Sequence, residues 1–156
     1  MKILKRILRK FLVFISIYRY KFLNFYILNL TKIWSKKCNV KSIPSCQQKT
    51  YVTGRGIVEI GEKCSFGYKL GGFWRGGSIE LQPRYENANI RLGNNIATNN
   101  NIFVCAANYI EVGNDVLIGQ NVCIMDFEAH GTNPAKRRNI GEIGKVIIGN
   151  NRANAS

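Results

Sequence analysis

The sequence predicts an all-β body, a triangular coil of short parallel strands, preceded by a basic amphipathic helical segment. Apolar residues recur at alternating spacings of four and two from Leu92 onward, and a Gly-Asn or Gly-Gln pair follows many of the residues that open a six-residue unit. Over the first 18 residues, in contrast, apolar residues follow helical spacing with Lys and Arg between them. We therefore expect a helical segment and linker over residues 1–50 and a β domain over residues 51–156.

The positive charge is concentrated in the N-terminal third of the 156-residue chain, whose length suits a single domain. Residues 1–50 contain 12 Lys or Arg and no Asp or Glu, so they carry +12 of the net charge of +14. Residues 51–156 contain 11 basic and 9 acidic residues and contribute only +2. This asymmetry predicts an anionic partner for the first segment rather than for the β domain.

The first 37 residues are interpreted as a helix that lies on a membrane surface. The apolar run from Phe11 to Tyr18 is shorter than the roughly 20 residues that span a bilayer, and Arg19 and Lys21 close it. No small-x-small cleavage site follows, which argues against a signal peptide. A basic helix can place Lys toward anionic headgroups and Phe, Leu and Ile toward lipid. Packing on the body or on a neighbouring subunit is an equal alternative, and no nucleic-acid-binding module is recognisable.

The β domain is predicted from a pattern of apolar residues, spaced alternately four and two apart, that repeats every six residues; this pattern is called the six-residue beat below. It runs through Leu92, Ile96, Thr98, Ile102 and Val104, and returns in Val112, Val116, Ile118, Val122 and Ile124. A helix would scatter these residues over several faces, whereas short strands separated by corners keep them inside a stacked coil. The residues that open the units, Leu92, Val112, Ile118 and Ile148, are expected to point inward. The Gly-Asn pairs are expected at corners, where both residue types tolerate left-handed backbone.

Two segments interrupt this pattern. Residues 36–50 contain Pro44 and several small polar residues, so they are predicted to be a linker. Residues 71–77 (GGFWRGG) break the beat and are predicted to leave the body as a loop. The five cysteines show no CxxC spacing, and with one histidine they predict reduced thiols and no metal site.

Residues 112–149 resemble the active-site segment of the hexapeptide-repeat acyltransferases, in particular the sugar O-acetyltransferases. The matching features are IGxNVxI at 118–124, MDFEAHGTNPAKRR at 125–138, Gly-Glu at 141–142 and VIIGNN at 146–151. The resemblance covers residues 51–151 and implies a left-handed parallel β-helix. It also implies transfer of an acetyl group from acetyl-CoA to a hydroxyl of a sugar or glycan acceptor, such as a polysaccharide, capsule or lipopolysaccharide precursor.

The resemblance assigns roles to three catalytic candidates. His130, the only histidine, stands at the position of the general base, a task that suits a side chain able to exchange protons near neutral pH. Glu142 matches a glutamate that orients this histidine or contacts the acceptor, and its alternative is an ordinary solvated charge. Asn99 matches a donor to the acceptor or to the developing oxyanion, although corner asparagines are common in this fold.

Three further residues are candidates for substrate binding. Asp126 fits the acid of the loop motif, which could orient His130, bind the acceptor or only shape the loop. Arg137 and Arg138 could contact an anionic sugar or the phosphates of coenzyme A, or be solvated loop charges. The resemblance also implies a homotrimer, with the donor bound between neighbouring subunits, and a cytoplasmic bacterial enzyme at or near the inner membrane.

Three other interpretations were considered. The γ-type carbonic anhydrases share the fold but bind zinc through three histidines, so one histidine excludes them. An amino group on a nucleotide sugar is an alternative acceptor, because the same base would serve it. The third is a C-terminally truncated, inactive β-helix that acts as a basic membrane-associated module, because the beat is lost after Asn151.

Overall fold

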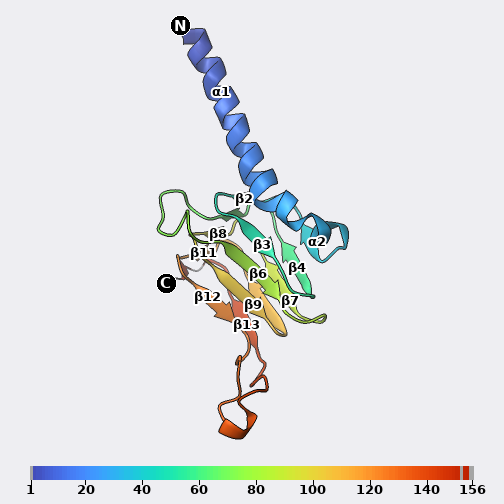
Figure 1. Cartoon of the computed structure of the whole chain (residues 1–156). Helices are drawn as coiled ribbons and strands as arrows, with labels where there is room; N and C mark the ends of the chain where they lie inside the picture. Colours follow the sequence, from blue (N-terminus) through green and yellow to red (C-terminus); the bar gives the residue numbers. More distant parts are fainter. Residues whose placement is uncertain (1, 152, 155–156) are drawn as a thin grey trace.

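The body of the protein consists of three parallel sheets wound by one chain. A computed structural model of the chain describes residues 2–151 and 153–154 (Figure 1). Sheet A contains β1 (Cys38–Val40), β4 (Ile57–Ile60), β7 (Asn89–Leu92), β10 (Tyr109–Val112) and β13 (Lys145–Ile148). Sheet B contains β2 (Ser45–Cys46), β5 (Ser65–Phe66), β8 (Ala97–Thr98), β11 (Leu117–Ile118) and β14 (Ala153–Asn154). Sheet C contains β3 (Thr50–Val52), β6 (Ile79–Pro83), β9 (Phe103–Ala106) and β12 (Cys123–Met125).

The chain visits sheets A, B and C in turn, so every three successive strands form one coil, and each strand pairs in parallel with its counterpart in the next coil. This arrangement is compatible with a parallel β-helix and confirms the predicted stacking of short parallel strands. The description as all-β is wrong for the whole chain, because residues 2–34 are helical. No strand pairing reaches that segment.

The helical segment has a free part and a docked part. Helix α1 (Lys2–Tyr18) projects away from the sheets (Figure 1). It continues into the π-helical η1 (Arg19–Tyr26), the short 3₁₀ turn η2 (Ile27–Asn29) and α2 (Leu30–Trp34), which lie against the first coil. By length and composition alone, the 31-residue helical run Leu4–Trp34 could cross a membrane, which is weak evidence. Its free part, α1, has 17 residues and rises about 25 Å, less than the roughly 30 Å hydrocarbon core of a bilayer.

The docked part closes the first end of the coil. The Phe25 side chain is fully buried within the main core. Asn29 donates to the Thr50 carbonyl at 2.9 Å and accepts from the Val52 amide at 2.6 Å, and Asn24 donates to the Cys46 carbonyl at 2.9 Å. Strands at the end of a sheet expose unpaired backbone groups that invite aggregation. The two asparagines satisfy these groups on β2 and β3, and Phe25 seals the apolar interior beneath them.

The first coil begins earlier than the linker prediction placed it. Strands β1 and β2 and the start of β3 lie within residues 36–50, so the β domain starts at Cys38 rather than at residue 51. Ser42, Pro44 and Gln47 lie at the corners between these strands, whereas Asn39 and Ser45 lie within β1 and β2. Cys38, Cys46 and Thr50 are buried and occupy interior positions that larger apolar residues, Val58, Phe66 and Ile79, fill in the next coil. Their small or polar side chains hid the six-residue beat.

The later coils match the predicted interior. Leu92 and Val112 are aligned across β7 and β10 and are buried, as is Ile118. Ile148 is aligned with Val112 across β13 and is half-buried against the same core. The coil repeats every 20 residues at this point, since Leu92 pairs with Val112. The predicted loop is also confirmed: residues 67–78 connect β5 to β6 without a strand.

The corners between sheets A and B use glycine and asparagine for different reasons. Left-handed backbone occurs at the second residue after the corner glycine, for example φ 57° at Asn95 and φ 58° at Asp115, and not at the glycine. A Cβ atom added to Gly93 would lie 2.7 Å from the Gly113 carbonyl group of the next coil. The glycine is therefore required by the close approach of stacked corners. The sequence predicts left-handed backbone for both Gly and Asn; at these corners it is found two residues after the glycine, and the prediction is wrong for the glycine itself.

Candidate functional site

The loop over residues 126–144 leaves the coil where sheet C meets sheet A and extends well beyond the body (Figure 1, orange). Its two arms pair in antiparallel fashion: the Glu128 amide donates to the Glu142 carbonyl, and the Gly141 amide donates to the Glu128 carbonyl, both at 2.9 Å. Phe127 and Ile143 form an antiparallel bridge at its base. The loop is thus a hydrogen-bonded hairpin and not an unsupported excursion.

The tip of the hairpin contains a short 3₁₀ turn, η3 (Pro134–Lys136). Proline suits the first position of a helical turn because its amide hydrogen is not needed there. The Asn133 side chain accepts from the Ala135 amide at 2.9 Å and caps the turn. Arg137 and Arg138 follow it, exposed like Lys136, so the tip presents three cationic side chains to solvent.

His130 lies on the outgoing arm, and its side chain is exposed. The returning arm passes close to its backbone, because a Cβ atom added to Gly141 would lie 3.2 Å from the His130 carbonyl oxygen, whereas the carbonyl of Glu142 accepts from the amide of Glu128. Among the described residues, no hydrogen bond joins the side chains of His130 and Glu142. The structure places these two candidates on facing arms of one hairpin.

Asp126 is buried at the base of the same hairpin, 6% exposed. One carboxylate oxygen accepts from the Ala107 amide at 2.6 Å, and the other accepts from the amides of Asn108 at 2.9 Å and Tyr109 at 2.6 Å. Its carbonyl accepts from the Gly144 amide at 2.6 Å and closes the hairpin. Of the three roles considered for Asp126, this geometry favours shaping the loop.

Asn99 lies at a different corner, between β8 and β9, where sheet B meets sheet C. Its side chain accepts from the Asn100 amide at 2.8 Å and is half-buried. The adjacent Asn100 is fully buried and ties down the 67–78 loop by donating to the carbonyls of Tyr68 and Gly72. Because His130 leaves from the opposite end of the sheet C strands, one chain does not bring Asn99 to His130.

Two contacts at the hairpin base escaped the sequence analysis. The Arg84 guanidinium lies over the Phe127 ring, 4.8 Å from its centroid, a geometry that favours cation–π attraction. Cys105 is buried in a small apolar cluster with Phe127 and Ala107. Burial raises the pKa of its thiol, which disfavours a nucleophilic role. The sequence could have indicated that Cys105 lies at the hairpin base, because it is the register partner of Met125, the last residue of β12 before the hairpin.

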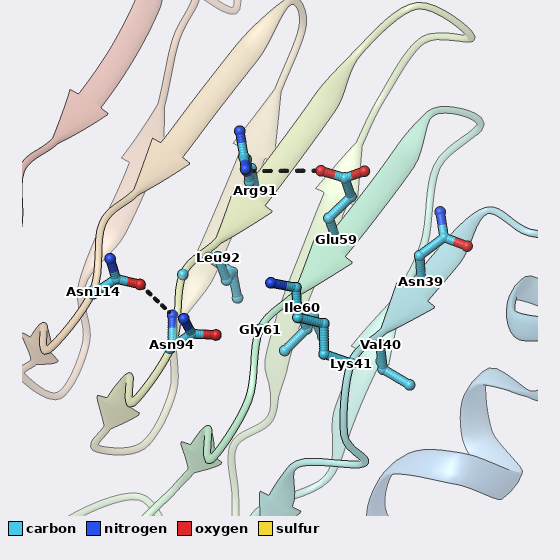
Figure 2. A pocket seen from close by; sticks show the side chains of 11 residues that line it. Asn39, Val40, Lys41, Glu59, Ile60, Gly61, Arg91, Leu92, Asn94 and Asn114 are labelled. Carbon is cyan, nitrogen blue, oxygen red and sulfur yellow. Dashed lines mark hydrogen bonds and ion pairs between the residues drawn. The ribbon is translucent and has the colours of Figure 1, made fainter.

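A concavity of about 460 Å³ lies on the outer face of sheet A (Figure 2). Arg91 and Glu59 face one another across neighbouring strands with 3.9 Å between Nε and Oε2, and Asn114 accepts from the Asn94 amide at 2.8 Å. The concavity lies toward the corner between sheets A and B, whereas the hairpin is joined to the other end of sheet A, where β13 begins. It therefore contains none of the candidate residues.

Comparison of the chain with protein-family models, curated proteins and solved structures finds no match. Among the described residues, no group of three or more His, Cys, Asp or Glu side chains could hold a metal ion.

Proposed function

We propose that this chain is a left-handed hexapeptide-repeat acyltransferase that transfers an acetyl group from acetyl-CoA to a sugar hydroxyl, with His130 as general base. The acceptor is a precursor of a polysaccharide, capsule or lipopolysaccharide. The enzyme works in the cytoplasm with residues 1–37 in contact with the inner membrane. The observation that carries this proposal is that the only histidine is exposed on a hydrogen-bonded hairpin leaving a six-residue-repeat coil.

The chemistry requires a base because a sugar hydroxyl is a weak nucleophile. The neutral imidazole of His130 takes the hydroxyl proton while that oxygen attacks the thioester carbonyl carbon. The carbon–sulfur bond then breaks, and His130 returns the proton to the departing thiolate. Glu142, on the facing arm, stabilises the imidazolium formed between these steps. The three cations at the hairpin tip supply charge for the phosphates of the donor or for an anionic acceptor.

The positions of the candidates support a proposal for the assembly. Asn99 and His130 lie at opposite ends of the strands of sheet C, so a role for both at one acetyl group requires two chains. A homotrimer would place the corner of one subunit beside the hairpin of the next. Light scattering should report three chains per particle. A strictly monomeric but active protein would remove Asn99 from the proposed site.

The test is turnover with a panel of sugars, with the acetylated product detected by mass spectrometry. His130→Ala should lower the rate by roughly 10²–10⁴-fold without lowering the thermal midpoint, because the side chain is exposed. Thr132→Ala, in the same exposed hairpin, is the matched control and should retain the parent rate. A fully active His130→Ala variant would refute the base assignment. Acetylation of amino sugars alone would identify the acceptor as an amine.

Donor binding is tested separately by calorimetry with acetyl-CoA. Binding by both the parent and His130→Ala would show a competent donor site that does not depend on the base. Absence of binding by a folded parent protein would support the inactive-module alternative.

A further inference from the structure

A cleft of about 680 Å³ lies at the base of α1, between η1, the first coil and the 67–78 loop. Three cationic side chains line it from three separate segments: Arg19 from η1, Lys49 from the corner before β3, and Arg75 from the loop. Among the described residues that line the cleft, none is Asp or Glu, and none of the three cations is ion-paired. Such a concentration of one charge attracts an anion.

The cleft is held in shape by hydrogen bonds that bind the loop to the first coil. The buried Gln48 donates to the Phe73 carbonyl at 2.8 Å and accepts from the Asn101 amide at 2.8 Å. The Trp74 indole donates to the Gln47 carbonyl at 2.8 Å, so its ring forms part of the wall. Arg75 is therefore presented from an anchored segment, which lowers the entropic cost of ligand binding.

The two sides of α1 differ in what they face. Near the C-terminal end of α1, Ser16, Ile17 and Tyr20 line a separate concavity together with Ser45 of the first coil, so this side of the helix is the one that faces the body there. Helical geometry places Ile7, Phe11 and Phe14 on the opposite side, and all three are more than half exposed. The basic residues Lys5, Arg6, Arg9 and Lys10 lie on the same side of the helix as Ser16, Ile17 and Tyr20, and Arg9 lines the same concavity.

An apolar stripe pointing away from the protein, with cations on the opposite side of the helix, matches a helix that lies in the interface of an anionic bilayer. Packing of this stripe on its own coil is excluded, because the opposite side faces the coil. With the stripe in lipid, η1 and Arg19 directly follow the embedded helix. The cleft then opens at the level of the headgroups.

We propose that this cleft binds the phosphate headgroup of an anionic membrane lipid, with Arg19, Lys49 and Arg75 as the ligating side chains. The inference rests on the proposed membrane contact of residues 1–37 and is independent of the chemistry of His130. Cations from three segments surround the phosphate, and the Trp74 ring lies beside them. The bound lipid fixes the coil at a set orientation to the bilayer, which α1 alone, joined at one end, does not.

The experiment is co-sedimentation of the full chain with vesicles of phosphatidylcholine alone or of phosphatidylcholine mixed with phosphatidylglycerol. The cleft variant combines Arg19→Gln, Lys49→Gln and Arg75→Gln. A matched control combines Lys41→Gln, Arg55→Gln and Lys145→Gln, three exposed positions outside the cleft with the same change in charge. A helix variant, Phe11→Asp with Phe14→Asp, tests the membrane contact itself. Circular dichroism verifies that each variant is folded.

The parent should bind the phosphatidylglycerol vesicles more tightly than phosphatidylcholine alone. The cleft variant should lose roughly fivefold per cation, about a hundredfold in total, whereas the control should lose less than about fivefold. Equal losses in cleft and control variants would overturn the headgroup site while leaving the membrane contact intact. Undiminished vesicle binding by the helix variant would refute the contact of α1 with the membrane, on which the headgroup proposal rests. Binding of soluble glycerol phosphate without vesicle binding would identify a free phosphate ester and overturn the lipid assignment.

Discussion

Replacing Asp126 by Asn should destabilise the protein, because this carboxylate accepts three backbone hydrogen bonds in a buried position. An amide offers one acceptor oxygen, so at least one of the amides of Ala107, Asn108 and Tyr109 loses its partner. An unpaired buried donor costs about 1–3 kcal/mol, and hydrogen bonds to a charged acceptor contribute about 1.5–3 kcal/mol. We expect a loss of about 2–4 kcal/mol, or a fall of roughly 5–15 °C in thermal midpoint for a domain of this size.

The assay is thermal unfolding followed by circular dichroism at one fixed protein concentration. Glu128→Gln removes a neighbouring but exposed carboxylate of the same hairpin and should change the midpoint by less than about 2 °C, since surface substitutions have small effects. A midpoint for Asp126→Asn within that margin would refute the structural role. If activity were then lost without a loss of stability, Asp126 would act on His130 or on the acceptor instead.

Two further outcomes follow from the buried groups. Phe25→Ala should cost about 3–5 kcal/mol in the free energy of unfolding, whereas Ile27→Ala, on an exposed neighbour, should cost less than about 1 kcal/mol; equal effects in denaturant titrations would contradict the end-sealing role of Phe25. Burial raises the pKa of the thiols of Cys38 and Cys46 to about 12. Unfolded thiols ionise from about pH 8.5 upward. Above that pH the unfolded chain therefore binds fewer protons than the folded chain. The free energy of unfolding should then fall by up to about 1.4 kcal/mol per pH unit for each thiol toward pH 12. Denaturant midpoints across this range measure the fall, and a Cys46→Ala variant with an equally steep decline would rule out that thiol as a source.

The repeating part of the fold could be predicted from sequence because each interior position is repeated in register. Leu92, Val112 and Ile148 occupy one column of sheet A, so their spacing reveals both the strands and the coil. The first coil could not be predicted in this way. Its interior contains Cys38 and Thr50, and its outer end is closed by Asn29 from a helix, which no coil periodicity predicts.

The candidate site could be predicted only in part. The hairpin and its histidine are local in sequence, so the motif places His130 and Glu142 on the two arms of one hairpin. The partners of Asp126 lie 17 to 19 residues earlier in the chain and are brought to it by the stacking of one coil on the next. Asn99 and Asn100 both lie beside the anchored loop, but only Asn100 donates hydrogen bonds to it, a distinction that depends on the path of residues 67–78.

The closed first end of the coil also has a consequence for the order of folding. During synthesis the residues of η1 and η2 leave the ribosome before any strand, so the surface formed by Phe25 and Asn29 is available when β2 and β3 emerge. Each later coil contacts mainly the one before it, and such quasi-one-dimensional structures propagate from a nucleus. Domains generally form from the N-terminal side during synthesis. We therefore expect the docked helix to act as the starting template on which the first coil, and then each later coil, forms.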